Sequence, residues 1–333
     1  MLLFKKKFFY YLYIFFLTLV LFFNEFSTNT SLSRNYNVLD IKVEENYDIN
    51  FNKSKIINKA FEEAFEILIF KLIESKDRSK IKNISLKDKK NLIENFSISN
   101  EQFINNKYIG QFNVQFSKRK ILNYLNYKNI IPSSPKEIDI LLLPILIDTN
   151  LNELYYLNQN IFYNYWNINS NNYHLINYIL PNEDIEDYDI IKKNIINIEN
   201  YDFREITKKY NLPNEIILIM LKSNSQLRVF SKIKFEKNKL LLNKTYNLNN
   251  IQIENKANDI IFSIKDNFED KWKSVNKINT SIKIPIKVSI ESNNTKLSQE
   301  LEKKFSSIDL IYKYKIESFN NKKIIYKIIF NGN

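Results

Sequence analysis

The sequence contains no cysteine, one histidine and two glycines among its 333 residues. The lack of cysteine excludes disulfides, thiolate nucleophiles and zinc–thiolate sites, and it is compatible with an oxidising compartment. Two glycines are too few for the glycine-rich loops that cradle the phosphates of nucleotides. Any Ser-His-Asp triad would have to use His174, and no G-x-S-x-G motif accompanies it. The sequence therefore spells out no reaction, and we interpret His174 as structural.

Arginine is also scarce, although the chain is basic. Five of the 49 basic residues are arginine, which leaves 44 lysines, and the net charge is +12. Lysine, asparagine and isoleucine are abundant, which is typical of a genome rich in A and T. The lysines are interleaved with Asp and Glu along the whole chain instead of forming a basic stripe. We therefore expect a solvated lysine surface with no nucleic-acid partner, and anionic lipid head groups are the alternative target.

The first 28 residues have the order of a secretory signal. Three lysines, Lys5 to Lys7, precede an uncharged apolar run from Phe8 to Phe23, and small polar residues follow it. The run is slightly short for a spanning helix, yet it is bulky and lacks a small-residue cleavage site. Cleavage as a signal peptide and retention of residues 8–23 as an inner-membrane anchor both stay open. Either outcome predicts a location in the periplasm, or on the membrane facing it.

The rest of the chain shows the periodicities of folded α/β units. Residues 37–46 alternate like a strand, and residues 53–75 carry apolar side chains at helical spacing. A capped helix is predicted from Ser85 to Asn95, followed by a strand or hairpin with Gly110 at its turn or bulge, and by a helix opened by Ser117. Together they make a β-α-α-β-α unit at residues 37–133.

Two more units are predicted after the prolines near residue 133. The central unit, 136–250, starts with the continuous apolar run "EIDILLLPILID", typical of a strand buried on both faces. It alternates strands and helices and ends in a hairpin near Lys237, which indicates a mixed or mostly parallel sheet. The last unit, 255–333, is a helix followed by β-α-β-β, with a turn at Asn320 and Asn321. The expected fold class is α/β (α+β), three small sheet-and-helix units with mixed sheets.

Several of these segments resemble the exported proteobacterial proteins grouped as domain of unknown function 2066. The long helix "KIINKAFEEAFEILIFKLIES", the strand "PKEIDILLLPILID", the stretch "LPNEDIEDYD" and the late helix with "KWKSV" carry the likeness. It covers nearly all of the chain after the signal. The matching positions are these: Leu180, Pro181, Asp184, Glu186, Asp187 and Trp272. The chain departs from the pattern where an Arg-Pro pair is expected, since it has Lys136 and Glu137 there. The resemblance implies an exported α/β protein and no particular activity.

The stretch "LPNEDIEDYD" places five acids within ten residues of a basic chain. Acids just after Pro181 fit the first turn of a helix, where exposed N–H groups and the helix dipole favour negative charge. Asp184 is expected to cap this helix or to bond a neighbouring loop. The alternatives are a face that binds a partner and a weak divalent-cation site, although the Ca²⁺-loop glycine is missing. Trp166 and Trp272 are interpreted as core anchors, with a recognition pocket as the alternative.

These observations favour a non-catalytic accessory or scaffold of the cell envelope, which binds an unknown envelope protein or the membrane surface and needs no cofactor. A periplasmic hydrolase using carboxylates and a protein that binds anionic lipid surfaces are the alternatives.

The export interpretation predicts the behaviour of a fusion protein. Residues 1–37 fused to a reporter that is active only outside the cytoplasm should give signal. Replacing Leu17 and Leu21 with Arg should abolish that signal, because charge in the apolar run opposes membrane insertion. A signal that survives both substitutions contradicts export.

Overall fold

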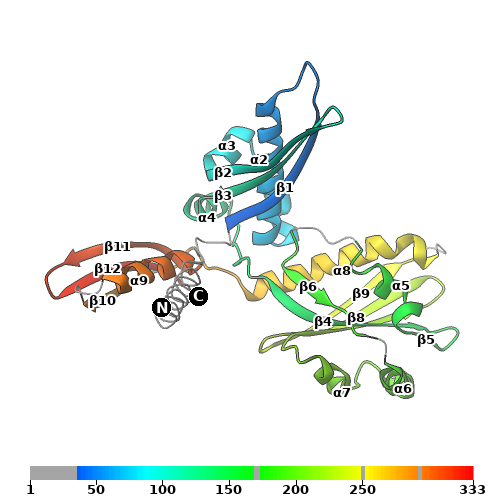
Figure 1. Ribbon diagram of the computed structural model, residues 1–333. Helices are drawn as coiled ribbons and strands as arrows, with labels where there is room; N and C mark the ends of the chain where they lie inside the picture. The colour runs from blue at the N-terminus through cyan, green and yellow to red at the C-terminus, as the bar shows by residue number, and fades with distance from the viewer. Residues whose placement is uncertain (1–35, 169–172, 183, 249–251, 292–294, 333) are drawn as a thin grey trace, which may run out of the picture. The chain divides into compact units, whose positions relative to one another are not determined.

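The computed structural model describes residues 36–168, 173–182, 184–248, 252–291 and 295–332. The predicted signal or anchor segment, residues 1–28, lies outside them. Helices and three β-sheets confirm the expected α+β class (Figure 1). In the part of the chain described, no helix has the length and apolarity needed to cross a bilayer. The described residues form two compact units: one holds residues 36–286 and 329–332, and the other holds Lys287–Ile328.

The first sheet has the strand order β1-β3-β2 and is antiparallel throughout. Its strands are β1 (Asn37–Asn46), β2 (Ile93–Ile104) and β3 (Lys107–Phe116). Val38, Ile41 and Val43 are all buried, although their spacing breaks the two-residue period of a strand. A bulge between Val38 and Ile41, with Asp40 at φ 58°, restores the inward direction.

The core of this sheet lies under helices. The long helix α2 (Lys53–Leu72) begins at Asn52, whose side-chain oxygen accepts the N–H of Ser54 at 2.9 Å. The shorter elements are η2 (Ser75–Ile81), α3 (Leu86–Leu92) and α4 (Lys118–Tyr127). Buried side chains of α2, Ala60, Phe65 and Leu68 among them, share one cluster with Phe112 and Phe116 of β3.

One local prediction in this unit was wrong, and another was confirmed in one of its two alternatives. The helix expected to reach Asn95 ends at Leu92, because residues 93–104 pair with β3 along its length. The hairpin turns at Asn105 and Asn106, both with positive φ. Gly110 lies within β3, opposite the bulge of β2 between Ser99 and Gln102, so the bulge alternative predicted for this glycine is confirmed. A Cβ at Gly110 would lie 2.7 Å from the hydroxyl of Tyr108, so glycine makes room for that ring.

The second sheet confirms the expected buried strand. Its order is β5-β4-β7-β8-β9, and β6 also pairs with β4. The strands are β4 (Ile138–Asp148), β5 (Glu153–Tyr155), β6 (Ile176–Ile179), β7 (Glu215–Lys222), β8 (Gln226–Phe235) and β9 (Asn238–Asn247). Both β6 and β7 run parallel to β4, whereas β5, β8 and β9 pair antiparallel with their neighbours. The sheet is therefore mixed.

Helices cover the two faces of this sheet (Figure 1). On one face, α8 (Ile253–Val275) and α5 (Ile161–Tyr165) pack on Ile140 and Leu142 of β4. On the other face, Leu143 and Ile145 of β4 share a core with Ile191. The elements there are η3 (Leu157–Gln159), α6 (Ile185–Lys193), η4 (Ile195–Asn197), α7 (Arg204–Thr207) and η5 (Lys208–Tyr210).

The third sheet has the order β10-β12-β11. Its elements are β10 (Lys283–Glu291), α9 (Thr295–Ser307), β11 (Ile311–Phe319) and β12 (Lys323–Asn331). The chain reverses between β11 and β12 at the predicted Asn320, whose side-chain oxygen accepts the N–H of Lys322 and of Lys323. Phe305 of α9 packs on Tyr326, with ring centroids 5.5 Å apart.

The packing of α2 predicts the cost of truncating one ring. Phe65 is 3% exposed, so Phe65→Ala should lower the free energy of unfolding by about 3 to 5 kcal/mol. Chemical denaturation checks this value. The neighbouring Glu66 is exposed, and Glu66→Ala should shift stability by less than about 0.5 kcal/mol. Equal, small effects of the two substitutions would show that α2 does not pack on the sheet as described.

Candidate functional site

The acidic stretch takes the chain from one face of the second sheet to the other. Leu180 packs against the core under α8, and the buried Pro181 follows it. Asp184 is the N-cap of α6, because its side-chain oxygen accepts the N–H of Glu186 at 2.9 Å. This confirms the predicted cap. Glu186 is exposed, whereas Asp187 is completely buried, and Glu183 lies outside the described residues.

One lysine joins the two aspartates. Lys209 of η5 donates to Asp184 Oδ2 at 2.6 Å and to Asp187 Oδ1 at 2.8 Å. The second oxygen of Asp187 is buried without a hydrogen-bond partner, as is the hydroxyl of Tyr156. The hydroxyl of Tyr210 accepts the N–H of Asn182 at 3.2 Å. We call Asp184, Asp187 and Lys209 the acid clamp, because they tie α6 to the segment after α7.

The contacts of the acid clamp shift the pKa values of Asp184 and Lys209, and the pKa of the neighbouring Tyr156 is shifted as well. The hydrogen bond to Lys209 is the main cause that lowers the pKa of Asp184. The hydrogen bonds to Asp184 and Asp187 raise the pKa of Lys209 above its usual value, so this lysine stays charged throughout the ordinary pH range. Burial raises the pKa of Tyr156, and the charge of Asp187 adds to the effect. Both carboxylates of the clamp are thus hydrogen-bonded to one charged lysine.

The structure does not bring Trp272 to this site. Trp272 is 1% exposed in the core under α8, on the opposite face of the sheet from Asp187. Its indole N–H donates to the carbonyl of Lys136 at 2.7 Å. Trp166 is also completely buried. Both tryptophans therefore lie where the core-anchor interpretation predicted.

His174 lies just before β6 beside a buried carboxylate of α8. Glu269 Oε1 accepts the N–H of Leu175 at 2.9 Å and that of Ile176 at 3.0 Å, and His174 Nδ1 lies 3.6 Å away. One helical turn earlier, the buried Lys265 donates to the carbonyl of Trp166 at 2.6 Å. These bonds hold the start of β6 and the end of α5 against α8, which supports a structural role for His174.

A groove of about 510 Å³ lies between residues 200–204 and the strands β7, β8 and β9 of the second sheet. Tyr201 and Phe203 form one wall, and β7, β8 and the start of β9 supply the rest. Residues that lie side by side on the three strands line the groove in two rows. Ile217, Lys232 and Leu241 form one row, and Glu215, Lys234 and Lys239 form the other. We call this feature the basic groove.

Charge in the basic groove is mostly positive. Its lining has four basic side chains, Arg204, Lys232, Lys234 and Lys239, against the two acidic ones Asp202 and Glu215, an excess of two positive charges. Lys232 donates to the carbonyl of Tyr201 at 2.9 Å and lies 5.6 Å above the ring of Phe203. Burial lowers the pKa of this lysine. Leu241 is 68% exposed and presents an apolar side chain next to these charges.

The acid clamp and the basic groove share one segment. Residues 200–204 form the wall of the groove, and Lys209 fixes the end of the same short helical region. Asp187 is near enough to Tyr201 to contribute to the raised pKa of that phenol, which is due mainly to burial. Asp184 and Asp187 therefore help to hold the wall of the basic groove, although neither residue lines the groove.

Sequence reasoning missed the basic groove itself. The alternation of Lys232 and Lys234 with buried Ile233 and Phe235 was visible and predicted a strand with one polar face. Nothing in the sequence indicated that helices leave this end of the face open. Among the described residues, no group of three or more acidic or histidine side chains is arranged to hold a metal ion.

Comparison with known proteins adds no relative. No protein-family model matches this chain, and no curated protein matches it significantly. The resemblance carried by the "LPNEDIEDYD" stretch stays a prediction.

The acid clamp predicts a pH-dependent contribution to stability. Lys209→Met removes the partner of the buried Asp187 and should cost about 1 to 2 kcal/mol, since Lys209 is itself partly exposed. The folded-state pKa of Asp184 is lowered, so its share is present above the unfolded pKa of about 4 and is lost as the pH falls further. The stability difference between wild type and Lys209→Met should shrink below that pH.

Urea unfolding at pH 7 and pH 3 measures this difference. The control is Lys208→Met, one residue earlier and exposed, which should be nearly neutral at both values. A difference that is the same at both pH values, or equal for the two lysines, argues against the clamp.

Proposed function

We propose that this protein is an exported, non-catalytic accessory of the Gram-negative cell envelope, which binds an extended acidic segment of another envelope polypeptide. The basic groove beside the edge strand β9 is the observation that carries the proposal. The sequence of residues 1–28 supports export, and the resemblance to the exported domain of unknown function 2066 supports the compartment.

The edge strand supports binding of an extended segment. Among the described strands of its sheet, β9 pairs with β8 on one side and with no strand on the other. A free edge presents unpaired backbone N–H and C=O groups, and partner peptides add to such edges as an extra strand. Main-chain hydrogen bonds would supply affinity, and the groove beside the edge would select side chains.

The lining of the groove supports an acidic partner with some apolar side chains. Lys239 is exposed at the start of β9, and Lys234 lies beside it, 3.8 Å from Glu215. These lysines repel the edge of a second, equally basic copy, which protects the free strand from self-association. They attract carboxylates at the same time. The exposed Leu241 and the rings of Tyr201 and Phe203 offer contact for alternate apolar residues.

A synthetic probe tests this chemistry directly. A fluorescent decapeptide of alternating Glu and Val should bind the full chain, and the same peptide with Lys in place of Glu should not. Lys239→Glu combined with Leu241→Asp should weaken binding at least tenfold, because it reverses charge and removes apolar contact. Binding should also weaken as salt rises. Fluorescence anisotropy gives the dissociation constants.

The matched control is Leu151→Asp, another exposed leucine of the same unit, outside the groove. Its affinity for the acidic peptide should equal that of the wild type. Equal binding of both peptides, or loss of binding in the control alone, would contradict the proposed site. Capture of envelope proteins from detergent extracts with wild type and the Lys239→Glu, Leu241→Asp variant would then identify the partner by mass spectrometry.

A further inference from the structure

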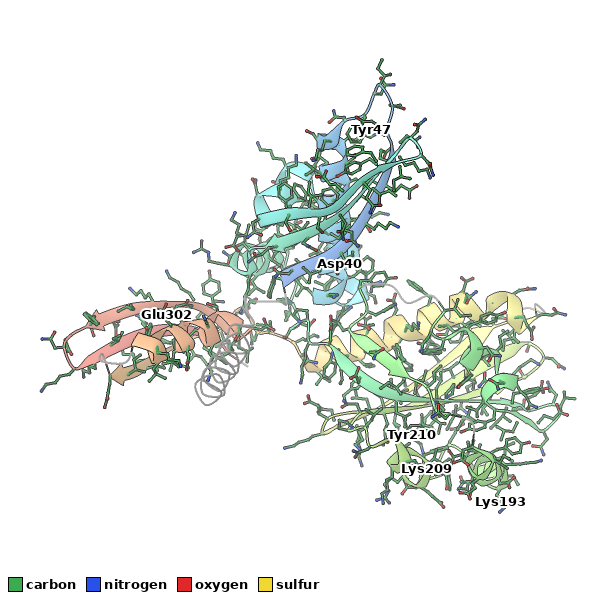
Figure 2. All side chains as sticks on the ribbon, in the orientation of Figure 1. Asp40, Tyr47, Lys193, Lys209, Tyr210 and Glu302 are labelled. Carbon is green, nitrogen blue, oxygen red and sulfur yellow. The ribbon has the colours of Figure 1, made fainter. Side chains whose placement is uncertain are left out.

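A cluster of exposed apolar side chains lies at the turn end of the first sheet. It is formed by the loop between β1 and α2 and by the turn between β2 and β3, and we call it the aromatic tip. Its exposed members are Tyr47, Ile49, Phe103 and Ile104, and the partly buried Phe51 packs against the rings of Tyr47 and Phe103. Figure 2 shows Tyr47 at this end of the sheet, with Asp40 much further back along β1.

The tip exposes far more apolar surface than its own fold requires. Tyr47 is 48% exposed, Ile49 is 100% exposed, and Phe103 and Ile104 are 57% and 50% exposed. Tyr47 and Ile49 come from the loop after β1, and Phe103 and Ile104 from the end of β2, over 50 positions later in the sequence. Single exposed apolar residues are common on protein surfaces, whereas a contiguous cluster marks an interaction site.

The two loops are held together as one structure. The N–H of Tyr47 donates to the carbonyl of Asn106 at 2.7 Å. The ring of Tyr47 lies 4.8 Å from those of Phe51 and Phe103, in edge-on contacts. Below them, the buried Tyr108 packs against Phe51 and Phe103. The exposed side chains are therefore displayed on an ordered base.

We propose that the aromatic tip inserts into the interfacial region of a lipid bilayer. A protruding loop end with tyrosine, phenylalanine and isoleucine matches the composition of interfacial anchors, because aromatic rings are favoured at the level of the head groups. This site is separate from the basic groove. It shares with the proposed function the location at the envelope, whereas insertion of the tip does not depend on what the groove binds.

The charges around the tip favour a bilayer over a strongly charged partner. Lys107 is paired with Glu44 at 2.5 Å, and Lys53 is paired with Glu101 at 2.7 Å. These pairs neutralise the rim, so apolar contact rather than net charge would drive binding. Asp48 lies between Tyr47 and Ile49, and its carboxylate accepts the N–H of Asn50 at 2.8 Å. That charge limits insertion to the head-group region.

The N-terminal sequence allows the tip to reach a membrane in which the apolar run is held. Thirteen residues, 24–36, separate Phe23 from the start of β1. They span at most about 43 to 47 Å when extended, whereas the ten residues of β1 measure about 33 Å from its start to the tip. The tether is thus longer than the strand, and an anchored chain can bring the tip back to the bilayer surface.

The absence of cysteine makes a site-specific test clean in the full chain. Single cysteines placed by Ile49→Cys and Ile104→Cys would carry a fluorophore that reports the polarity of its surroundings. The matched controls are Ile196→Cys, at a site that is 99% exposed, and Leu151→Cys, at a site that is 63% exposed, both outside the tip. Each protein is reconstituted into phosphatidylcholine vesicles, with and without phosphatidylglycerol and with nitroxide-labelled lipid.

Labels at positions 49 and 104 should shift to the blue and be quenched several-fold more than the control labels, in both kinds of vesicle and at high salt. Adding Ile49→Asp should abolish the shift at position 104, whereas Ile196→Asp should leave it. No shift at positions 49 and 104, or equal shifts at all four positions, would overturn the proposal. A shift that requires phosphatidylglycerol and disappears in salt would overturn it too, because lysine adsorption would then explain binding.

Discussion

Strand β4 must be covered on both faces, and most of the larger unit depends on that requirement. Ten of its eleven residues, all except Asp139, are buried. Burying a leucine or isoleucine side chain contributes about 1.5 to 3 kcal/mol, so a strand of this composition requires a helical layer above and below it. Helix α8 supplies one layer, and the short elements from α6 to η5 supply the other (Figure 1). The parallel pairing of β4 with β6 and β7 follows, because crossover connections place helices on the faces.

Helix α8 covers β8 and β9 on its own face of the sheet, but among the described elements the cover over β4 on the face of α6 and α7 does not extend to this far edge. Strands β8 and β9 follow β7 as antiparallel hairpins, and connections this short cannot carry helices that would cover them. On the face of α6 and α7, this edge of the sheet therefore leaves the basic groove open, with Lys232 and Leu241 in its lining. The acid clamp holds the wall of the groove through Asp184 and Asp187, which gives a structural role to two of the five acids in the acidic stretch. Structural carboxylates and a candidate binding surface are thus neighbours with different roles.

Helices and strands, and with them the fold class, could be predicted where burial of one or both faces produces a regular pattern of apolar residues. The helical face around Phe65 and the continuous apolar run of β4 are confirmed for this reason. Errors occurred where long-range pairing overrode local preference, as in residues 93–95, which pair with β3 instead of extending α3. For the acid stretch, the cap at Asp184 was predictable from residue type, whereas its bond to Lys209 joins positions 25 apart and depends on the tertiary fold. The basic groove arises from missing cover, which has no signature in local sequence.

The scarcity of glycine also affects the unfolded state, because it lowers the number of conformations that the unfolded chain can adopt. Nine non-glycine residues adopt positive φ among those described, and six of them are asparagine. Asparagine tolerates this left-handed backbone through its short polar side chain, as at Asn105 and Asn106. A glycine at the same turn would give the unfolded chain many more conformations to lose on folding. Each asparagine therefore trades a little strain in the folded turn for a less disordered unfolded chain, and the use of asparagine at these turns shifts the folding equilibrium through entropy rather than through contacts.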